Sequence, residues 1–355
     1  MSTLSLCMIV KDEEANIRRC LESVRLVADE IIIVDTGSSD STKAICSEFT
    51  DNIFDYQWDG NFADARNFSI GKASSDWVLW MDADEELYMK SPDKLKQHLD
   101  REESVFYPVR MLHIIDTVSE YHKQPYVSYH HRLFRNRLNF KFNGAIHEKL
   151  ILPEPIEGIP VDNCLEILHY GYLEKDAAKK AYRNLELLFQ EKQIQRDDPW
   201  LDYHIAAELY RLQQVEAAFQ FVNHSIVGFL SLGVMPPALA YKLKYDMLIS
   251  MGNMEQAYQG IEKAIELYPD YVELHFYRGV ILYSLKHYEA ALGAFTYCLI
   301  LGEANPGYLI RLGSGSFHAY HFLGECYTRM GRYDIAQSAY QRAARYPQRF
   351  SPAKL

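Results

Sequence analysis

The chain has 355 residues, of which 48% are hydrophobic and 24% are charged, and its formal net charge is −11. This composition is typical of a globular protein and excludes collagen-like, disordered and coiled-coil chains. At about 100–200 residues per domain, the length predicts two domains. The charge imbalance lies entirely in residues 1–175, which hold 19 basic and 30 acidic side chains, whereas residues 176–355 hold 18 of each. Such an acidic chain has no global attraction to nucleic acid or anionic lipid, so neither is expected as a partner.

Neither the beginning of the chain nor its cysteines indicate export. The N-terminal apolar run lacks a preceding basic region, and no stretch approaches 18 consecutive apolar residues, so we expect no signal peptide and no transmembrane segment. The six cysteines are scattered and form no CxxC pair. This pattern is typical of reduced cysteines in a protein core. We therefore expect a cytoplasmic protein.

The first hundred residues alternate strand-like and helix-like segments. Short apolar runs predict strands over residues 4–10, 31–34, 53–58 and 77–81. Helical spacing predicts helices over residues 12–27, 41–49 and 62–73. The alternation predicts an α/β domain with a mostly parallel sheet, whose ligand crevice lies at the carboxyl ends of the strands.

From about residue 177 the pattern is helical only, and it repeats. Ala257 and Ala291 stand 34 residues apart, which is the period of tetratricopeptide repeats. Ala336 follows 45 residues after Ala291, so an insertion of about eleven residues is expected as a loop around 303–316. A weaker copy of the repeat has Ala218 at the key position. We predict an all-α tetratricopeptide-like superhelix over residues 176–355, with a generic helical bundle as the alternative.

Two carboxylates, Asp82 and Asp84, follow the fourth expected strand. Carboxylates that leave a buried strand together concentrate negative charge, which is costly without a cation. Hard oxygen ligands suit Mg²⁺ or Mn²⁺, and these ions bridge the phosphates of substrates. The motif therefore predicts a site for a metal and a diphosphate; the alternative is a solvated turn.

The second expected strand ends at Asp35 and runs into a Gly-Ser turn. The P-loop pattern is absent from the chain, and the dinucleotide fingerprint is missing after the first strand. A carboxylate at a strand end can accept a hydrogen bond from a base N–H, so Asp35 is expected in a nucleotide site. Asp40 or Ser41 is expected to cap the following helix.

Four segments carry a resemblance to a known family: CMIVKDEEANIRRCLESV, EIIIVDTGSSDSTKAI, FADARNFSIGKASSDWVLWMDADEEL and FNGAIHEKL. In their order and spacing they resemble a family-2 glycosyltransferase of the GT-A fold over residues 3–173. This fold is the Rossmann-like mixed sheet of the nucleotide-diphospho-sugar transferases. The resemblance implies an inverting transfer of a hexose-type sugar from a UDP-sugar, with Mn²⁺ or Mg²⁺. Together with the repeats, the chain is similar to bacterial cell-surface glycosyltransferases and to the enzymes that put sugar on bacteriocin peptides.

The resemblance also implies a role for individual residues of the donor site. Val10, Lys11 and Glu13 would lie beside uridine, and Asp35 would hold the uracil. Asp64 and Arg66 would lie near the nucleotide and the sugar. Asp82 would face the ribose or the sugar, and Asp84 would bind the metal. The chain departs from the family where the usual Thr-Tyr-Asn before the glutamate pair is Val10-Lys11-Asp12. This departure leaves the identity of the base open.

A basic stretch follows in the second part of the first domain. No acid occurs between Glu120 and Glu148, whereas five Lys or Arg and four His do. In an acidic domain this stretch favours a site for donor phosphates or an anionic acceptor, with Arg132 and Arg135 as the candidates. An ordinary solvated edge strand is the alternative.

Glu148 is the candidate general base. Inversion requires one carboxylate to deprotonate the acceptor as it attacks the anomeric carbon from the face opposite UDP. The family places an acid in this segment, and Glu148 is the only acid between Glu120 and Glu154; an ion pair with an arginine is the alternative. His147 is expected to orient the acceptor or Glu148. His169 is a candidate contact to the metal or diphosphate, against a histidine of the core.

Two hypotheses describe the whole chain. In the first, a metal-dependent glycosyltransferase uses its repeats to present a peptide, protein or glycan acceptor, or to form a homodimer. In the second, an inactive glycosyltransferase-like domain is carried by a scaffold of repeats. The clustered carboxylates favour the first, because a decayed site has no physical reason to keep them. Balanced charge and six repeat tyrosines favour peptide or subunit contact: Tyr241, Tyr245, Tyr277, Tyr283, Tyr320 and Tyr327.

Overall fold

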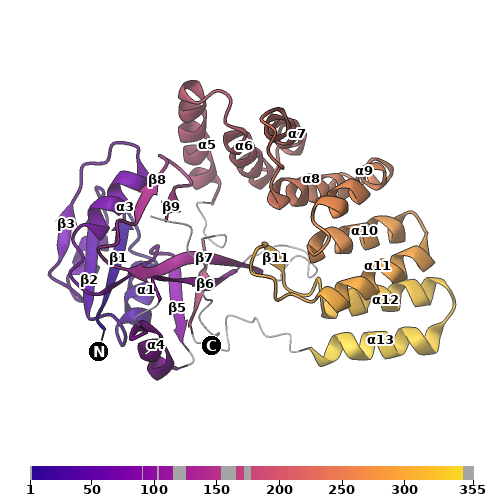
Figure 1. Ribbon diagram of the computed structural model, residues 1–355, viewed down its shortest axis with the longest axis horizontal. Helices are drawn as coiled ribbons and strands as arrows, with labels where there is room; N and C mark the ends of the chain where they lie inside the picture. The colour runs from indigo at the N-terminus through magenta and orange to yellow at the C-terminus, as the bar shows by residue number, and fades with distance from the viewer. Residues whose placement is uncertain are drawn as a thin grey trace. The chain divides into compact units, whose positions relative to one another are not determined.

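The computed structural model describes residues 2–89, 91–101, 104–114, 125–152, 165–171 and 177–346. The chain divides into two compact units, and Figure 1 labels their helices and strands. The first unit comprises residues 1–116 and 129–177, and the second comprises residues 117–128 and 178–355. The sequence suggested a single boundary between residues 175 and 176. It did not predict that residues 117–128 group with the second unit.

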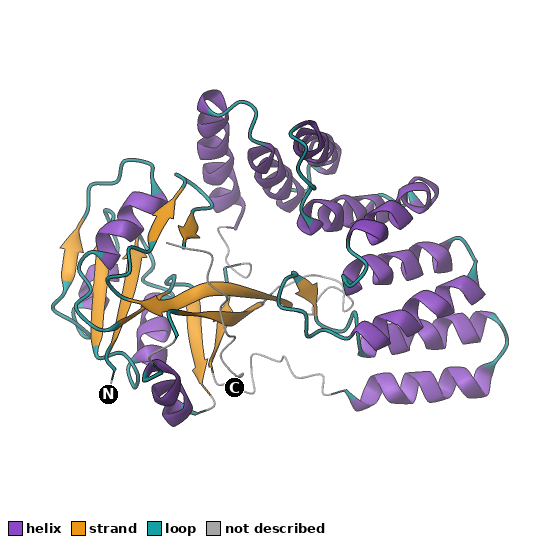
Figure 2. Ribbon diagram, in the orientation of Figure 1, coloured by secondary structure: helices purple, strands orange, loops and turns teal. Residues whose placement is uncertain are grey.

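The first unit is built on a mixed β-sheet (Figure 2). Along the sheet the strands follow the order β3-β2-β1-β4-β7-β6-β10-β5. β1 pairs in parallel with β2 and β4, and β2 with β3. β7 pairs antiparallel with β4, and β5 pairs antiparallel with β10. The fold class expected from the alternating pattern and the resemblance is confirmed. The strands are β1 Leu4–Val10, β2 Glu30–Asp35, β3 Ile53–Asp55, β4 Trp77–Trp80, β5 Glu85–Met89, β6 Phe106–His113, β7 Tyr126–Arg135 and β10 Leu165–His169, with a separate hairpin of β8 Lys141–Asn143 and β9 Lys149–Ile151.

Helices cover both faces of this sheet. The even-numbered apolar residues of β1, among them Leu4, Leu6 and Met8, pack in one core cluster with side chains of α1 and α4. Cys7 points to the other face, where its Sγ lies 3.6 Å from the carbonyl oxygen of Ser69 in α3. This alternation follows from the two-residue period of a strand. The helices of this unit are α1 Ile17–Val24, α2 Thr42–Cys46, α3 Phe62–Ile70 and α4 Pro92–Leu99.

The second unit consists of helix pairs, as the repeat pattern predicted. The helices are α5 Ala177–Ile194, α6 Pro199–Arg211, α7 Val215–Ser231, α8 Ala238–Ser250, α9 Met254–Leu267, α10 Val272–Ser284, α11 Tyr288–Leu301, α12 Phe317–Arg329 and α13 Tyr333–Arg345. From α6 onward, each even-numbered helix packs against the next one in the chain. The four key alanines, Ala218, Ala257, Ala291 and Ala336, are buried in the second helix of each pair.

The expectation of helices alone was wrong at one place in this unit. Inside the predicted loop 303–316, Ile310–Arg311 forms the short strand β11, which pairs antiparallel with Val127 and Tyr126 of β7. The backbone N–H of Arg311 donates to Glu273 at 2.6 Å. These partners hold the inserted segment extended.

The repeat tyrosines are largely inside the second unit. Tyr245 and Tyr277 are each only 3% exposed, and the Tyr277 hydroxyl donates to Asp246 at 2.6 Å. The expectation that these two rings contact a peptide is therefore wrong, because they fill the core between helices. Five cysteines are free and buried, and Cys164 lies outside the described residues. Among the described helices, none has the length and apolar character needed to cross a bilayer.

Candidate functional site

Two loops at the carboxyl ends of β1 and β2 hydrogen-bond to each other. The backbone N–H of Asp12 donates to Ser38 Oγ at 3.0 Å, and that of Ser41 donates to Glu14 Oε2 at 3.0 Å. Because its backbone is bound in this way, the segment after β1 is a loop, and α1 begins only at Ile17. The helix expected from residue 12 therefore starts later, and the two loops form one continuous rim.

The residues expected beside uridine belong to this rim. Val10 is buried at the end of β1, and its carbonyl oxygen accepts from Thr36 N–H at 3.0 Å. Lys11 is exposed. Glu13 is half-buried, and its Oε2 accepts from Asn16 Nδ2 at 3.0 Å. The three residues lie together in the chain at one strand end, but the contacts of their side chains with a base remain a prediction.

Asp35 is buried at the end of β2, where its own turn binds it. Its Oδ2 accepts from the backbone N–H groups of Gly37 and Ser38, both at 3.1 Å. Gly37 has φ +107, a conformation that favours glycine. As expected, Asp40 caps α2, since its Oδ1 accepts from Thr42 N–H at 2.9 Å.

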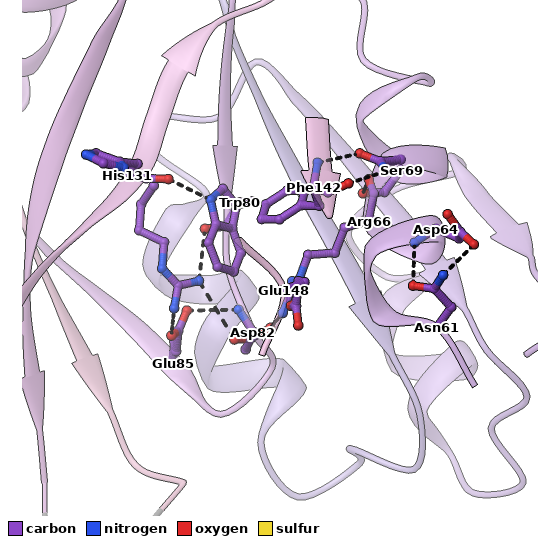
Figure 3. A network of polar contacts seen from close by, with 12 residues as sticks. Asn61, Asp64, Arg66, Ser69, Trp80, Asp82, Glu85, His131, Phe142 and Glu148 are labelled. Carbon is purple, nitrogen blue, oxygen red and sulfur yellow. Dashed lines mark hydrogen bonds and ion pairs between the residues drawn. The ribbon is translucent and has the colours of Figure 1, made fainter. Parts of the chain in front are cut away.

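Arg66 joins two parts of the site that lie far apart in the sequence. It stands on α3 with its side chain 9% exposed. One amino group donates to Asp82 Oδ1 at 2.7 Å, and Nε donates to Glu148 Oε1 at 2.5 Å (Figure 3). Its guanidinium lies 4.3 Å from the centre of the Trp80 ring. The ion pair considered as the alternative for Glu148 is thus present, and its partner is a predicted site residue.

Asp64 lies two residues before Arg66 on α3 and does not join this network. It is exposed, and its carboxylate accepts from Asn61 Nδ2 at 2.7 Å. Asn61 in turn accepts from the Asp64 backbone N–H at 3.3 Å (Figure 3). This reciprocal pair caps the first turn of α3.

Arg132 is buried on the other side of Trp80. It donates to Glu85 Oε1 at 2.7 Å, lies 3.7 Å from Asp82 Oδ2, and stacks 3.5 Å above the Trp80 ring. Glu85 also accepts from the backbone N–H of Asp82 at 2.9 Å. Sequence reasoning missed both Glu85 and Trp80. The sequence did hold a signal for Glu85, because it directly follows Asp84 in a short run of acids. A turn this short cannot expose every carboxylate of such a run to water.

Burial and charge act in opposite directions on these carboxyl groups. Burial raises the pKa of Glu85 to about 8, the nearby Asp82 and Asp84 add to the rise, and Arg132 works against it. Burial also penalises ionised Asp82, but Arg66 and Arg132 outweigh it and hold the Asp82 pKa well below its usual range. The two arginines therefore serve as counterions, and the acids of this group outnumber them.

Arg135 is not brought to the group. It pairs with Trp77 at the start of β4, whereas Asp82 follows the end of that strand. Its guanidinium donates to the carbonyl oxygens of Ser104 and Arg101, each at 2.6 Å. The predicted contact of Arg135 with donor phosphates does not fit this position.

Asp84 and His169 meet across neighbouring strands. β10 runs antiparallel to β5, which places His169 opposite Glu85 and one residue from Asp84. His169 Nε2 lies 3.7 Å from Asp84 Oδ1. In the described ranges no three His, Cys, Asp or Glu residues gather as a metal group. Asp84 and His169 are two candidate ligands, and such a pair suits a cation whose remaining ligands are phosphate oxygens and water.

Two further histidines surround His169. His113 Nδ1 lies 3.1 Å from His169 Nδ1. The His113 and His130 ring centres are 6.1 Å apart. Burial lowers the pKa of His113 well below its usual range, and it lowers that of His130 to about 3, with Arg132 adding to both effects. His147, by contrast, is exposed, with φ 52, between β8 and β9.

The comparisons with known proteins agree with this organisation. Residues 5–152 match the family described as Glycosyl transferase family 2, and residues 317–348 match the family described as Tetratricopeptide repeat. The chain carries a family-2 glycosyltransferase domain followed by tetratricopeptide repeats. The predicted resemblance is thereby confirmed.

Two curated relatives resemble most of the chain. A TPR repeat-containing protein of Synechococcus elongatus is 31% identical over 280 residues, which cover 76% of this chain and 65% of that protein. The SPbeta prophage-derived glycosyltransferase SunS of Bacillus subtilis is 27% identical over 297 residues, covering 79% and 67%. The chain thus spans about two thirds of each relative. A solved structure, MamA from Desulfovibrio magneticus, is 13% identical over 49% of this chain and 93% of that one, with a TM-score of 0.40.

Most of the site lies inside the matched glycosyltransferase segment. Asp35, Arg66, Asp82 and Glu148 fall within residues 5–152. His169 lies after this segment, on the last strand of the glycosyltransferase unit. The sheet register, rather than the family match, is what brings His169 to Asp84.

Proposed function

We propose that the protein is an inverting glycosyltransferase that moves a hexose-type sugar from a UDP-sugar to a peptide, protein or glycan acceptor. One observation carries the proposal. Arg66 binds Asp82, at the end of β4, and Glu148, in the connection from β8 to β9, in the same network. A donor-side carboxylate and the candidate base are thereby held beside each other at the carboxyl ends of the parallel strands, where such sheets bind ligands.

The donor nucleotide would occupy the rim formed by the loops after β1 and β2. Val10, Lys11, Glu13 and Asp35 are the candidate contacts. The mutual hydrogen bonds of the two loops support this role, because a preformed rim loses little conformational entropy when a nucleotide binds. Asp64, on the exposed cap of α3, is a candidate contact at the edge of the same site.

Asp84 and His169 would hold Mn²⁺ or Mg²⁺ together with the donor diphosphate. Burial raises the pKa of Glu85 to about 8, so this acid adds little charge near pH 7. The other three acids, Asp82, Asp84 and Glu148, face two buried arginines, which leaves net negative charge for a cation. When bound, such a cation stabilises the charge that develops on the leaving diphosphate. Asp82, with Arg66 as its counterion, would then face the ribose or the sugar.

Glu148 would accept the proton of the attacking acceptor group. Its side chain is 10% exposed, so a substrate can reach it while the surroundings stay poor in water. Arg66 binds Oε1; in the described part of the chain Oε2 makes no hydrogen bond, and this oxygen would take the proton. The exposed His147, next in the chain, would contact the acceptor.

The repeats would present the acceptor or join two copies of the chain. The tetratricopeptide class commonly binds extended peptides on its concave surface. Of the six repeat tyrosines, four remain candidates for such contacts, because they are only partly buried: Tyr241, Tyr283, Tyr320 and Tyr327.

The decisive experiment measures hydrolysis of a panel of UDP-sugars by the full-length chain with Mn²⁺. We expect turnover of at least one UDP-hexose, loss of turnover in EDTA, and recovery when Mn²⁺ or Mg²⁺ is restored. Asp84→Asn should abolish turnover while leaving the thermal melt unchanged. Asp51→Asn changes an exposed acid before β3 in the same way and should keep full activity.

The same experiment separates the alternative hypothesis of an inactive scaffold. A scaffold would turn over no member of the panel, whether or not it still binds the nucleotide. Full activity in EDTA would contradict the cation but not the transferase. Binding of UDP without turnover or transfer to any acceptor would favour the scaffold.

A further inference from the structure

The space between Asp84 and His169 is kept open by a glycine. Tyr170 N–H donates to the Asp84 carbonyl oxygen at 3.0 Å, which sets the next residue, Gly171, beside both side chains. A Cβ at Gly171 would lie 2.7 Å from Asp84 Oδ2 and 2.7 Å from His169 Nε2. These separations are shorter than carbon–oxygen and carbon–nitrogen contacts allow. The two candidate ligand atoms therefore point at the volume that any other side chain would fill.

A second residue acts on the other nitrogen of His169. β10 runs parallel to β6, and this register pairs His169 with His113. The 3.1 Å between their Nδ1 atoms is a hydrogen bond in which one ring donates and the other accepts. If His169 donates, its proton is on Nδ1, and the lone pair of Nε2 faces Asp84.

We propose that Gly171 and His113 are positioning residues for a divalent cation held by Asp84 and His169. Gly171 leaves the volume for the cation, and His113 accepts the Nδ1 proton so that His169 presents a bare Nε2. The inference rests on the proposed function, because it assigns the surroundings of the cation suggested there. Neither residue falls in the segment that carried the sequence motifs of the metal site.

The expected effects follow from the geometry. Ala at residue 171 would force the Asp84 carboxylate and the His169 ring apart, and both are side-chain ends that can move without unfolding the sheet. Loss of the partner that orients a ligating histidine typically weakens metal binding by about 10–100-fold. His113→Leu removes this acceptor at similar size, whereas the amide oxygen of His113→Asn stands near the position of Nδ1.

The experiment measures Mn²⁺ affinity of the full-length chain with saturating UDP, by the EPR signal of free Mn²⁺. We expect Gly171→Ala and His113→Leu to bind about 10–100-fold more weakly than the wild type. His113→Asn should bind close to the wild type. Gly293→Ala, which adds a Cβ with no heavy atom within 4 Å, is the matched control and should bind unchanged. Circular dichroism and thermal melts check that every variant is folded.

The outcomes separate this inference from the proposed function. Wild-type affinity in folded Gly171→Ala and His113→Leu would overturn the inference alone. Equal loss in His113→Leu and His113→Asn would overturn the role of the hydrogen bond. If the wild type hydrolyses UDP-sugar but binds no Mn²⁺, the inference fails while the proposed glycosyltransferase activity remains supported. If Gly171→Ala does not fold, the comparison of His113→Leu with His113→Asn still tests the inference.

Discussion

At the scale of single residues, the site depends on two buried arginines that sequence reasoning placed on substrate phosphates or near the nucleotide. Arg66 and Arg132 lie on either side of Asp82 and close to the ring of Trp80. Such counterions allow several carboxylates to stay ionised in a buried site. Asp82 thus keeps a charge that burial alone would remove by protonation, whereas burial raises the pKa of Glu85 to about 8 despite Arg132.

The first residue-scale prediction concerns Glu148. Glu148→Gln keeps the size of the side chain and its acceptor for Arg66, but it cannot take a proton. We expect transfer to slow by about 10²–10⁴-fold, which is the usual contribution of a general base. UDP affinity, measured by calorimetry, should change little. Glu22→Gln, at an exposed position of α1, is the control. A parallel fall of rate and UDP affinity would instead make Glu148 a binding residue.

The second residue-scale prediction concerns the pH dependence of stability. Glu273 is fully buried; its Oε1 accepts from Arg311 N–H and Ser314 Oγ, and among the described residues its Oε2 has no partner. Burial raises its pKa above the ordinary value of 4.5, although Arg311 and Lys242 oppose the rise. The folded state thus keeps a proton that the unfolded state releases. The free energy of unfolding should therefore fall as the pH rises above about 4.5.

Glu273→Gln tests this directly, because glutamine does not titrate. Urea unfolding between pH 5 and pH 8 should show a shallower decline for Glu273→Gln than for the wild type. Glu266→Gln changes an exposed glutamate of α9 and should follow the wild type. Parallel curves for all three proteins would contradict the prediction.

At the scale of elements, the helix pairs depend on glycines at their crossings. A Cβ at Gly279 in α10 would lie 2.6 Å from the Phe295 ring of α11, and one at Gly324 in α12 would lie 2.5 Å from the Tyr340 ring of α13. The two contacts occupy equivalent positions in successive repeats. In both repeats the glycine lies 12 residues before the key alanine and the aromatic residue lies 4 residues after it, so the same contact recurs in each helix pair.

A pair of alanine substitutions tests this packing. Gly279→Ala should destabilise the protein by about 1–3 kcal/mol, since the core is already full there. Gly293→Ala, on exposed α11 surface with no heavy atom within 4 Å, should stabilise it by about 0.5–1 kcal/mol through helix propensity. Urea unfolding measures both changes. Equal effects of the two substitutions would show that backbone propensity, and not the Phe295 contact, decides the stability change at Gly279.

Sequence reasoning succeeded where a local pattern determines the structure. The bounds of β1 and the start of α5 were predicted from periodicity, because a strand or helix period is visible within a few residues. It failed where register decides. Arg132 and Arg135 are three residues apart in one basic stretch, yet only Arg132 reaches the acids. The pairing of His113 with His169, and the place of Gly171, likewise arise from strands that neighbour each other only in the folded sheet.

At the scale of the whole molecule, strand β7 belongs to both units. Its residues 126–128 group with the second unit, and the rest group with the first. The Tyr126 hydroxyl accepts from Arg311 Nε at 3.1 Å, and Lys242 Nζ lies 4.4 Å from the Tyr126 ring. Asp246 binds Lys242 at 2.8 Å. Residues of two other chain segments, α8 and β11, thus hold the beginning of this strand.

This arrangement matters while the ribosome synthesises the chain. Tyr126 and Arg311 are 185 residues apart. At about 5–20 residues per second, a ribosome needs roughly 10–40 s to reach Arg311 after Tyr126. Throughout that interval the beginning of β7 lacks the strand with which it pairs in the finished protein, and unpaired strand edges invite pairing with other chains. Synthesis, rather than the completed fold, is therefore the period in which this protein is most exposed to aggregation.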